Sequence, residues 1–264
     1  MDSQDAILTT LYVATTGNDG NSGTSPQQAL RTIGRAVDLA VSTYLPQGPV
    51  EVEVAGGTYA EQVTISFSTP YSLTITGSQD PTNPTVVEPS ALALNLTEGN
   101  TGYFFDDNVG NTAAIMGIHD TGAPVVVQYL TISGASLTPP PGPWSGLAYV
   151  NASGTAANNQ LQHIQIASIL GQASVHGIEV KATSGVASVT LTQNRLSDYP
   201  GHVAIALMAG GETSGVLDAE VSGNRLIGNP TTEVAPVAQF GIVAAGVRHL
   251  TITENRISDF SSPW

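Results

Sequence analysis

The sequence lacks cysteine and is poor in basic residues. Without cysteine, a disulfide framework, a thiolate metal site and a cysteine nucleophile are excluded. Lys and Arg number 7 against 21 Asp and Glu, which gives a formal net charge of −14. Because there is no basic excess, neither a phosphate backbone nor an anionic membrane surface attracts the chain. We therefore expect no nucleic-acid partner and no membrane partner.

Charged residues and long hydrophobic runs are also scarce. Only 11% of the residues are charged, whereas 41% are hydrophobic and 28 are glycine, which is typical of a packed, turn-rich globular protein. No segment reaches the roughly 18 apolar residues of a membrane-spanning helix, and the start of the chain does not read as a signal peptide. The Ser, Thr, Asn and Gly content favours an extracellular or cell-surface location, with the export signal absent from this sequence.

Short apolar–polar alternations recur along the chain with a period of about 30 residues. Each alternation predicts a strand with one buried and one polar face. A first series of aligned segments comprises 130–133, 164–167, 189–192, 219–222 and 250–253. A second series interleaves with it and is centred on Ile115, Leu147, Ile178, Ile205 and Ile242.

An Asn-Arg pair follows the first-series strand in three successive repeats, at Asn194, Asn224 and Asn255. Asparagine tolerates the left-handed backbone of a sharp bend, and its amide can bond to the asparagine of the next repeat. The pattern predicts an all-β solenoid in which short strands stack in parallel, coil upon coil, around one continuous core. We expect a single domain, 1–264, with three strands in each coil.

The N-terminal part differs from the repeats. Leu30, Ile33, Val37 and Ala40 keep helical spacing, and Ser25-Pro26 offers an N-cap followed by proline. An amphipathic helix of this length suits the open end of a solenoid core. The sequence thus predicts a strand and capping helix over 11–48, followed by solenoid coils over 50–264.

These features resemble the right-handed parallel β-helix of the pectate-lyase-like superfamily. Its coils match the repeats, and its asparagine ladder matches the recurrent Asn-Arg pairs. The opening also resembles that of many bacterial β-helix proteins, in segments 11–14, 17–24, 29–37, 50–54 and 56–59. The resemblance implies that substrates, typically polysaccharides, lie along the outer face of the first parallel sheet, which here is the sheet of the second series.

On that face, strand alternation leaves a charged pair in the middle coil, Glu179 and Lys181. The loop that enters the next coil adds Asp198, Tyr199 and His202 beside them. Together they could supply the base, acid and charge clamp for proton abstraction next to a uronate carboxylate and elimination. In a hydrolase, Glu179 and Asp198 would be the two carboxylates. The alternative is a solvated pair on a strand beside an ordinary loop.

Other polar residues have weaker signals. His119-Asp120 is a second imidazole–carboxylate pair. The loop of Asp19 could hold Ca²⁺, but an ordinary Asn/Gly turn is the favoured interpretation because Asp19 is the only carboxylate of that loop. The arginines after the recurrent asparagines, Arg195, Arg225 and Arg256, are periodic, which favours a structural role. We expect an extracellular carbohydrate-directed β-helix protein that binds or cleaves a glycan along the outer face of the first parallel sheet. If it is an enzyme, we expect a polysaccharide lyase or glycoside hydrolase. The alternative is a non-catalytic structural, adhesive or self-assembling module that forms homo-oligomers or stacks end to end.

Overall fold

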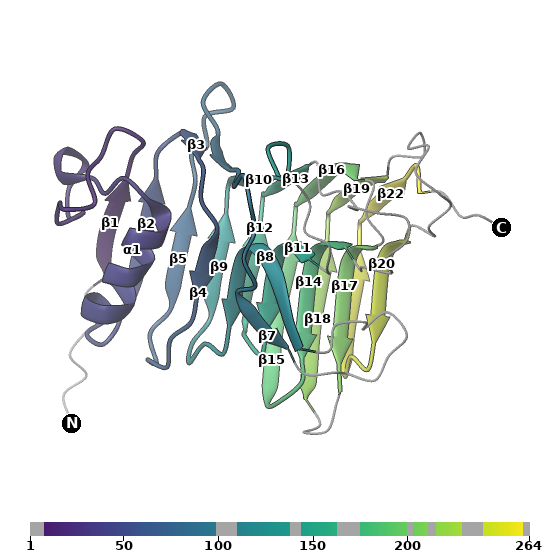
Figure 1. The fold of residues 1–264 in the computed structure, drawn as a ribbon. Coiled ribbons are helices and arrows are strands. Elements are labelled where there is room, and N and C mark those ends of the chain that lie inside the picture. The colour runs from purple at the N-terminus through teal and green to yellow at the C-terminus, as the bar shows by residue number, and fades with distance from the viewer. Residues whose placement is uncertain are drawn as a thin grey trace.

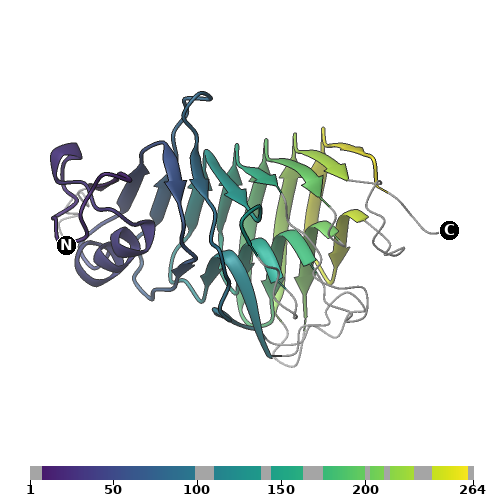
Figure 2. The same cartoon turned by 45° about the horizontal axis from the view of Figure 1, so that its top comes forward.

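The computed structural model describes residues 8–98, 110–137, 144–162, 175–199, 203–210, 215–228 and 240–260. Its strands form three parallel sheets that wind into a right-handed parallel β-helix, so the predicted fold class is confirmed (Figures 1 and 2). Sheet A contains β1 (Thr9–Val13), β2 (Val50–Val54), β5 (Leu73–Thr76), β9 (Val125–Gln128), β12 (Gly154–Ala157), β15 (Val186–Thr192), β18 (Val216–Ser222) and β21 (His249–Thr253).

The other two sheets complete the coils. Sheet B contains β3 (Gly57–Tyr59), β6 (Thr85–Val87), β10 (Leu130–Ser133), β13 (Gln160–Gln162), β16 (Arg195–Tyr199), β19 (Arg225–Gly228) and β22 (Arg256–Ser258). Sheet C contains β4 (Val63–Ile65), β8 (Gly110–His119), β11 (Trp144–Val150), β14 (Val175–Ala182), β17 (Val203–Ala209) and β20 (Phe240–Ala245). One further strand, β7 (Leu96–Glu98), pairs antiparallel with β8.

The inward side chains stack along the solenoid axis. In sheet A, Ile75 pairs in register with Val127, and Leu191 with Val221, and all four are fully buried. Each inward residue therefore packs on its counterparts in the coils on either side as well as across the coil. Burial of this continuous apolar column supplies the main stabilising term.

Two details of the strand alignment differ from the sequence prediction. Segment 130–133 belongs to sheet B, whereas 189–192 belongs to sheet A. In the coil that contains 130–133, the sheet A strand that corresponds to 189–192 is Val125–Gln128. In sheet C, Leu147, Ile178, Ile205 and Ile242 pair in register as predicted, but Leu147 faces Met116 and not Ile115. Segment 164–167 lies outside the described residues.

The sheet C strands share an irregularity that explains the misassigned residue. Ala204 and Ile205 are consecutive, yet both belong to the main core, and so do Ile115 and Met116. Alternation therefore breaks at this position. A side chain on the equivalent Gly177 would come within 2.3 Å of Leu196, because the backbone there turns toward the core. Simple alternation cannot choose between two adjacent inward residues.

The sharp corner between sheets A and B is built by two consecutive residues. The asparagines Asn159, Asn194, Asn224 and Asn255 form a hydrogen-bonded column. The side-chain oxygens of the last three each accept from the backbone N–H of the preceding asparagine, at 2.9–3.1 Å. The left-handed backbone belongs to the residue just before each asparagine, not to the asparagine itself as predicted. These residues are Asn158 (φ 56°), Gln193 (56°), Gly223 (63°) and Glu254 (57°).

The N-terminal end of the core is covered by helix, as Figure 1 shows. The α-helix α1 (Ile33–Leu39) runs directly into a π-helical segment, η2 (Ala40–Tyr44), and buries Ile33, Ala36 and Val37. Its N-cap is Thr32, whereas Ser25-Pro26 opens a separate 3₁₀ turn, η1 (Pro26–Gln28). The predicted helix therefore begins later than expected. None of the helices in the described ranges is long and apolar enough to cross a membrane.

Candidate functional site

The predicted charged pair lies in sheet C at the centre of the molecule. Ile178 and Val180 of β14 belong to the main core, whereas Glu179 and Lys181 lie on the opposite, outer face of the strand. Both side chains are nevertheless 0% exposed. The alternative interpretation of a solvated pair on a strand is therefore wrong, and whether Glu179 and Lys181 form a site stays a prediction.

The outer face of sheet C is closed over in neighbouring coils as well. Leu96 of β7 packs in one apolar cluster with Ala114, Ala148 and Val150. Ala206 and Met208 of β17, which pair with Glu179 and Lys181, are also 0% exposed. A polysaccharide groove along this sheet, as the resemblance implied, is closed at these buried residues, and at Ala148 and Val150 the covering side chain is Leu96 of β7.

Two further polar side chains join the charged pair. Ser145 of β11 is in register with His176 of β14, and both are buried at 0–1% exposure. The Ser145 hydroxyl donates to Glu179 Oε2 at 2.5 Å, and His176 Nδ1 lies 3.3 Å from the same oxygen. We call Ser145, His176, Glu179 and Lys181 the buried polar cluster.

The charge state of Glu179 follows from competing effects. Burial alone raises the pKa of the carboxyl, but the nearby charges of His176 and Lys181, with the Ser145 hydrogen bond, outweigh it and lower the pKa. Glu179 is therefore a carboxylate at neutral pH. Its chemistry is that of a base or an electrostatic partner, not of a proton donor.

Several polar atoms of the cluster lack hydrogen bonds. Among the described residues, three buried atoms have no partner with hydrogen-bond geometry: both ring nitrogens of His176 and Glu179 Oε1. His176 Nδ1 is nevertheless close to Glu179 Oε2. A buried unsatisfied polar atom typically costs about 1–3 kcal/mol. Such a cluster is consistent with a functional role for its free atoms.

The remaining predicted residues are only partly described. Asp198 and Tyr199 end β16, so their backbone belongs to sheet B, while their side chains and all of His202 lie outside the described part of the structure. The chain re-enters sheet C at Val203, which pairs with His176. The predicted convergence of this loop on Glu179 stays a prediction.

Sequence reasoning missed Ser145 and His176 for different reasons. Both precede the position where alternation breaks, which is Gly177 in β14. An alternation counted back from Ile178 therefore places His176 inside the core. The segments that begin at Ser145 and His176 align without a gap, and this alignment could have shown that the two residues are neighbours in the sheet. Only the break in alternation turns both side chains to the outer face.

The secondary sequence candidates have other partners. His119 Nδ1 contacts Asp120 at 3.2 Å in an exposed position. Asp19 accepts hydrogen bonds from the backbone N–H groups of Arg31 and Thr32 at 2.8 and 2.9 Å, and from the Thr32 hydroxyl. The Asp19 carboxylate thus braces the start of α1. Across the described ranges, no three His, Asp or Glu side chains are grouped as a metal site.

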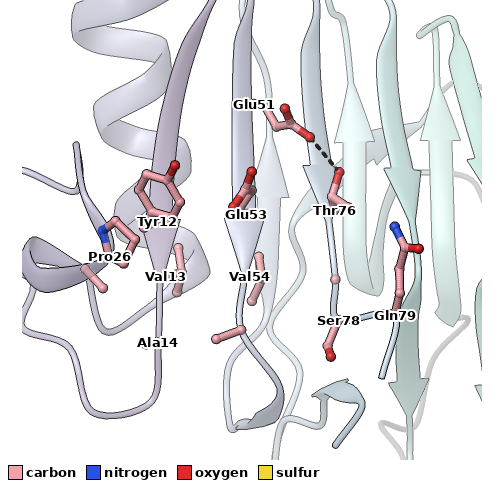
Figure 3. A pocket seen from close by; sticks show the side chains of 13 residues that line it. Tyr12, Val13, Ala14, Pro26, Glu51, Glu53, Val54, Thr76, Ser78 and Gln79 are labelled. Atoms are coloured by element: carbon pink, nitrogen blue, oxygen red, sulfur yellow. Dashed lines mark hydrogen bonds between the residues drawn. The ribbon is translucent and has the colours of Figure 1, made fainter. Parts of the chain in front are cut away.

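An open cleft lies elsewhere, on the outer face of sheet A near the N-terminus. It has a volume of about 520 Å³ and lies over β1, β2 and β5 (Figure 3). Tyr12 and Glu53 are register partners on adjacent strands, and Glu51 accepts a hydrogen bond from Thr76 at 3.2 Å. Figure 3 shows these side chains on the same side of the sheet. We call this feature the β2 cleft.

The β2 cleft combines an aromatic ring with free hydrogen-bond acceptors. Tyr12 is half-buried, so one part of its ring is fixed while the rest reaches solvent, and Glu53 is exposed. Sequence reasoning missed it because Tyr12 and Glu53 are far apart in the chain and become neighbours only through the parallel pairing of β1 with β2.

Comparisons with known proteins support the fold only. A scan against family models found no match, and a search of curated proteins found none. Among solved structures, the chain is similar to the GH136 lacto-N-biosidase from Eubacterium ramulus, at a TM-score of 0.51 and 13% identity. The similarity covers 82% of this chain and 41% of the lacto-N-biosidase. The chain thus spans about two fifths of the length of that enzyme.

Proposed function

We propose that this protein is an extracellular carbohydrate-directed β-helix that binds a neutral glycan in the β2 cleft. The observation that carries the proposal is the placement of the half-buried Tyr12 beside Glu51 and Glu53 in an open cleft. An aromatic face packs against the apolar face of a sugar ring, and carboxylates accept hydrogen bonds from its hydroxyl groups. The fold similarity to a lacto-N-biosidase, a protein named for action on a carbohydrate, agrees with this class of ligand.

The charge of the cleft selects among glycans. Two carboxylates, Glu51 and Glu53, line it, so a polyuronate is repelled there, whereas a neutral glycan is not. The cleft is also the accessible one of the two sites, since the buried polar cluster is closed to a polymer.

The test is a titration with a panel of neutral oligosaccharides and polygalacturonate, followed by calorimetry. For the best neutral ligand, we expect Tyr12→Ala to weaken binding roughly ten-fold and Glu53→Gln several-fold. Glu220→Gln is the matched control, because Glu220 is exposed on the same face of sheet A but on the distant β18. Equal effects of Glu53→Gln and Glu220→Gln, or no binding of any neutral glycan, would contradict the proposal.

A second candidate function is glycan cleavage at the buried polar cluster, extended by Asp198, Tyr199 and His202, and it requires that the packing over the outer face of sheet C opens to admit the glycan. His176 Nε2 and Glu179 Oε1, which lack hydrogen bonds, favour it, since a buried base and a buried imidazole can exchange protons with a substrate. Reducing-end release detects a hydrolase, and ultraviolet absorbance of an unsaturated product detects a lyase. Loss of activity in both Glu179→Gln and His176→Asn, with unchanged glycan binding in the β2 cleft, would assign cleavage to the cluster.

A further inference from the structure

Three exposed arginines lie in register on the outer face of sheet B. Arg195 pairs with Arg225, and Arg225 pairs with Arg256, on the adjacent strands β16, β19 and β22. Figure 1 shows these strands side by side toward the C-terminal end of the solenoid. We call the three residues the arginine column. It holds three of the seven basic residues of a chain whose net charge is −14.

The arginine column has no anionic partner among the described residues. Arg248, by contrast, bonds to Asp218 through its Nε at 2.9 Å and its Nη2 at 2.5 Å. Arg35 donates to the Asp19 carbonyl at 3.3 Å. Within the described ranges, a carboxylate thus neutralises Arg248 but none is paired with the arginine column.

The fold does not require arginine at this position. The inward neighbours Leu196 and Leu226 are fully buried and supply the packing of these coils. Gln160 of β13 occupies the same position one coil earlier, in register with Arg195. Neighbouring parallel strands are about 4.8 Å apart, and like charges directly opposite each other destabilise a sheet. The column thus repels itself, with no compensating ion pair among the described residues.

We propose that the arginine column binds a linear sulfated glycan that runs along the solenoid axis. Guanidinium groups pair with oxyanions through parallel N–H···O bonds. A sulfate ester offers three oxygens, so one sulfate can bridge two arginines on neighbouring strands, whereas a carboxylate has only two oxygens to share between them. The ligand class and the sheet differ from those of the β2 cleft, so this inference goes beyond the proposed function.

The overall negative charge does not prevent local binding. At physiological ionic strength the Debye length is about 8 Å, so carboxylates on distant faces are largely screened at the column. Three arginines at successive strand spacings then act together. Replacing the central residue, Arg225, removes both sulfate bridges, the one to Arg195 and the one to Arg256.

The experiment measures binding of the full chain to immobilised dextran sulfate, with unsulfated dextran, polygalacturonate and single-stranded DNA as comparison ligands. We expect wild-type protein to bind dextran sulfate and not dextran. Arg225→Gln should weaken binding roughly five-fold, and the triple Arg→Gln variant of the column should abolish it. Arg31→Gln is the matched control, because it removes the same charge from an exposed arginine at the N-terminal end.

A second measurement separates binding from structure. Because the column repels itself, Arg225→Gln should leave the melting temperature unchanged or raise it. Three results would overturn the proposal: equal weakening by Arg31→Gln and Arg225→Gln, a clear drop in melting temperature for Arg225→Gln, or binding of polygalacturonate or DNA as tight as that of dextran sulfate.

Discussion

At the scale of single residues, the asparagine column shows how one side chain can bind two coils together. The Asn224 side-chain oxygen accepts from the Asn194 backbone and side-chain amides at 2.9 and 3.0 Å. Its own amide donates to the Leu191 carbonyl at 2.8 Å and to Asn255. Asn224 is 1% exposed, so no water replaces these bonds when the side chain is removed.

We therefore expect Asn224→Ala to lower the free energy of unfolding by about 2–4 kcal/mol, since it leaves several buried groups unpaired. Urea denaturation measures the change. Asn255→Ala should cost less, because Asn255 is only partly buried. Gln193→Ala, at the exposed position just before Asn194, is the control, and a loss as large as that of Asn224→Ala would contradict this account.

Glu179 makes acid stability a readout of the buried polar cluster. The folded pKa of Glu179 lies below its ordinary value of 4.5, so the ionised carboxylate stabilises the folded state. This contribution is present above pH 4.5 and is lost as the pH falls through the lowered folded pKa. The free energy of unfolding should therefore fall more steeply below pH 4.5 in wild-type protein than in Glu179→Gln.

The contribution of His176 to the lowered pKa of Glu179 can be tested separately. His176→Asn removes the nearest positive group while keeping a polar side chain, so it should flatten the acid dependence toward that of Glu179→Gln. Parallel pH profiles for wild type and Glu179→Gln would show that the cluster does not hold Glu179 in its ionised form.

At the scale of elements, the position of the capping helix depends on a carboxylate from another coil. Glu61 accepts from the backbone N–H groups of Ile33 and Gly34, both at 2.8 Å, and thereby satisfies the first turn of α1. Burial raises the pKa of Glu61, and the two backbone bonds partly offset that rise. The apolar spacing of Leu30, Ile33 and Val37 could predict the helix, but not this long-range cap.

Replacing Glu61 by Ala should lower the free energy of unfolding by about 1–2 kcal/mol, because two helix N–H groups lose their acceptor. Glu61→Gln should cost less, since its amide oxygen still accepts one bond. Asp38→Ala, at an exposed position of the same helix, serves as the control. The measurement is chemical denaturation, and equal stability of all three variants would count against the cap.

At the scale of the whole molecule, the net charge of −14 opposes the compact state. Carboxylates outnumber basic groups three to one, and the basic residues are few enough that most carboxylates have none beside them. Self-repulsion of this kind is long-ranged and is screened by salt. The apolar core along the axis must exceed this repulsion for the coils to stack.

Thermal unfolding should therefore respond to ionic strength. Raising NaCl from low to physiological concentration should increase the melting temperature by on the order of a few degrees, as expected for about 1 kcal/mol in a chain of this size. The same salt added to the triple Arg→Gln variant of the arginine column should have a larger effect, because its net charge is more negative. A melting temperature that falls with NaCl would contradict this prediction.

The sequence by itself determined the architecture, because a period of about 30 residues with alternating apolar positions can bury its core only by stacking coils. It also located Glu179, Lys181 and the recurrent asparagines. The fourth asparagine, Asn159, escaped because no arginine follows it, although it lies 35 residues before Asn194. A repeat can be detected by comparing the sequence with itself, without any knowledge of the tertiary structure.

Only the tertiary structure decided which polar residues are accessible. Alternation assigns a side chain to a face of a strand, but it does not say whether another segment packs on that face, so Glu179 and Lys181 were placed on the correct side and wrongly exposed. The β2 cleft and the arginine column likewise arise from register between separate coils. Burial and register are relations between distant segments, and a strand's own sequence does not contain them.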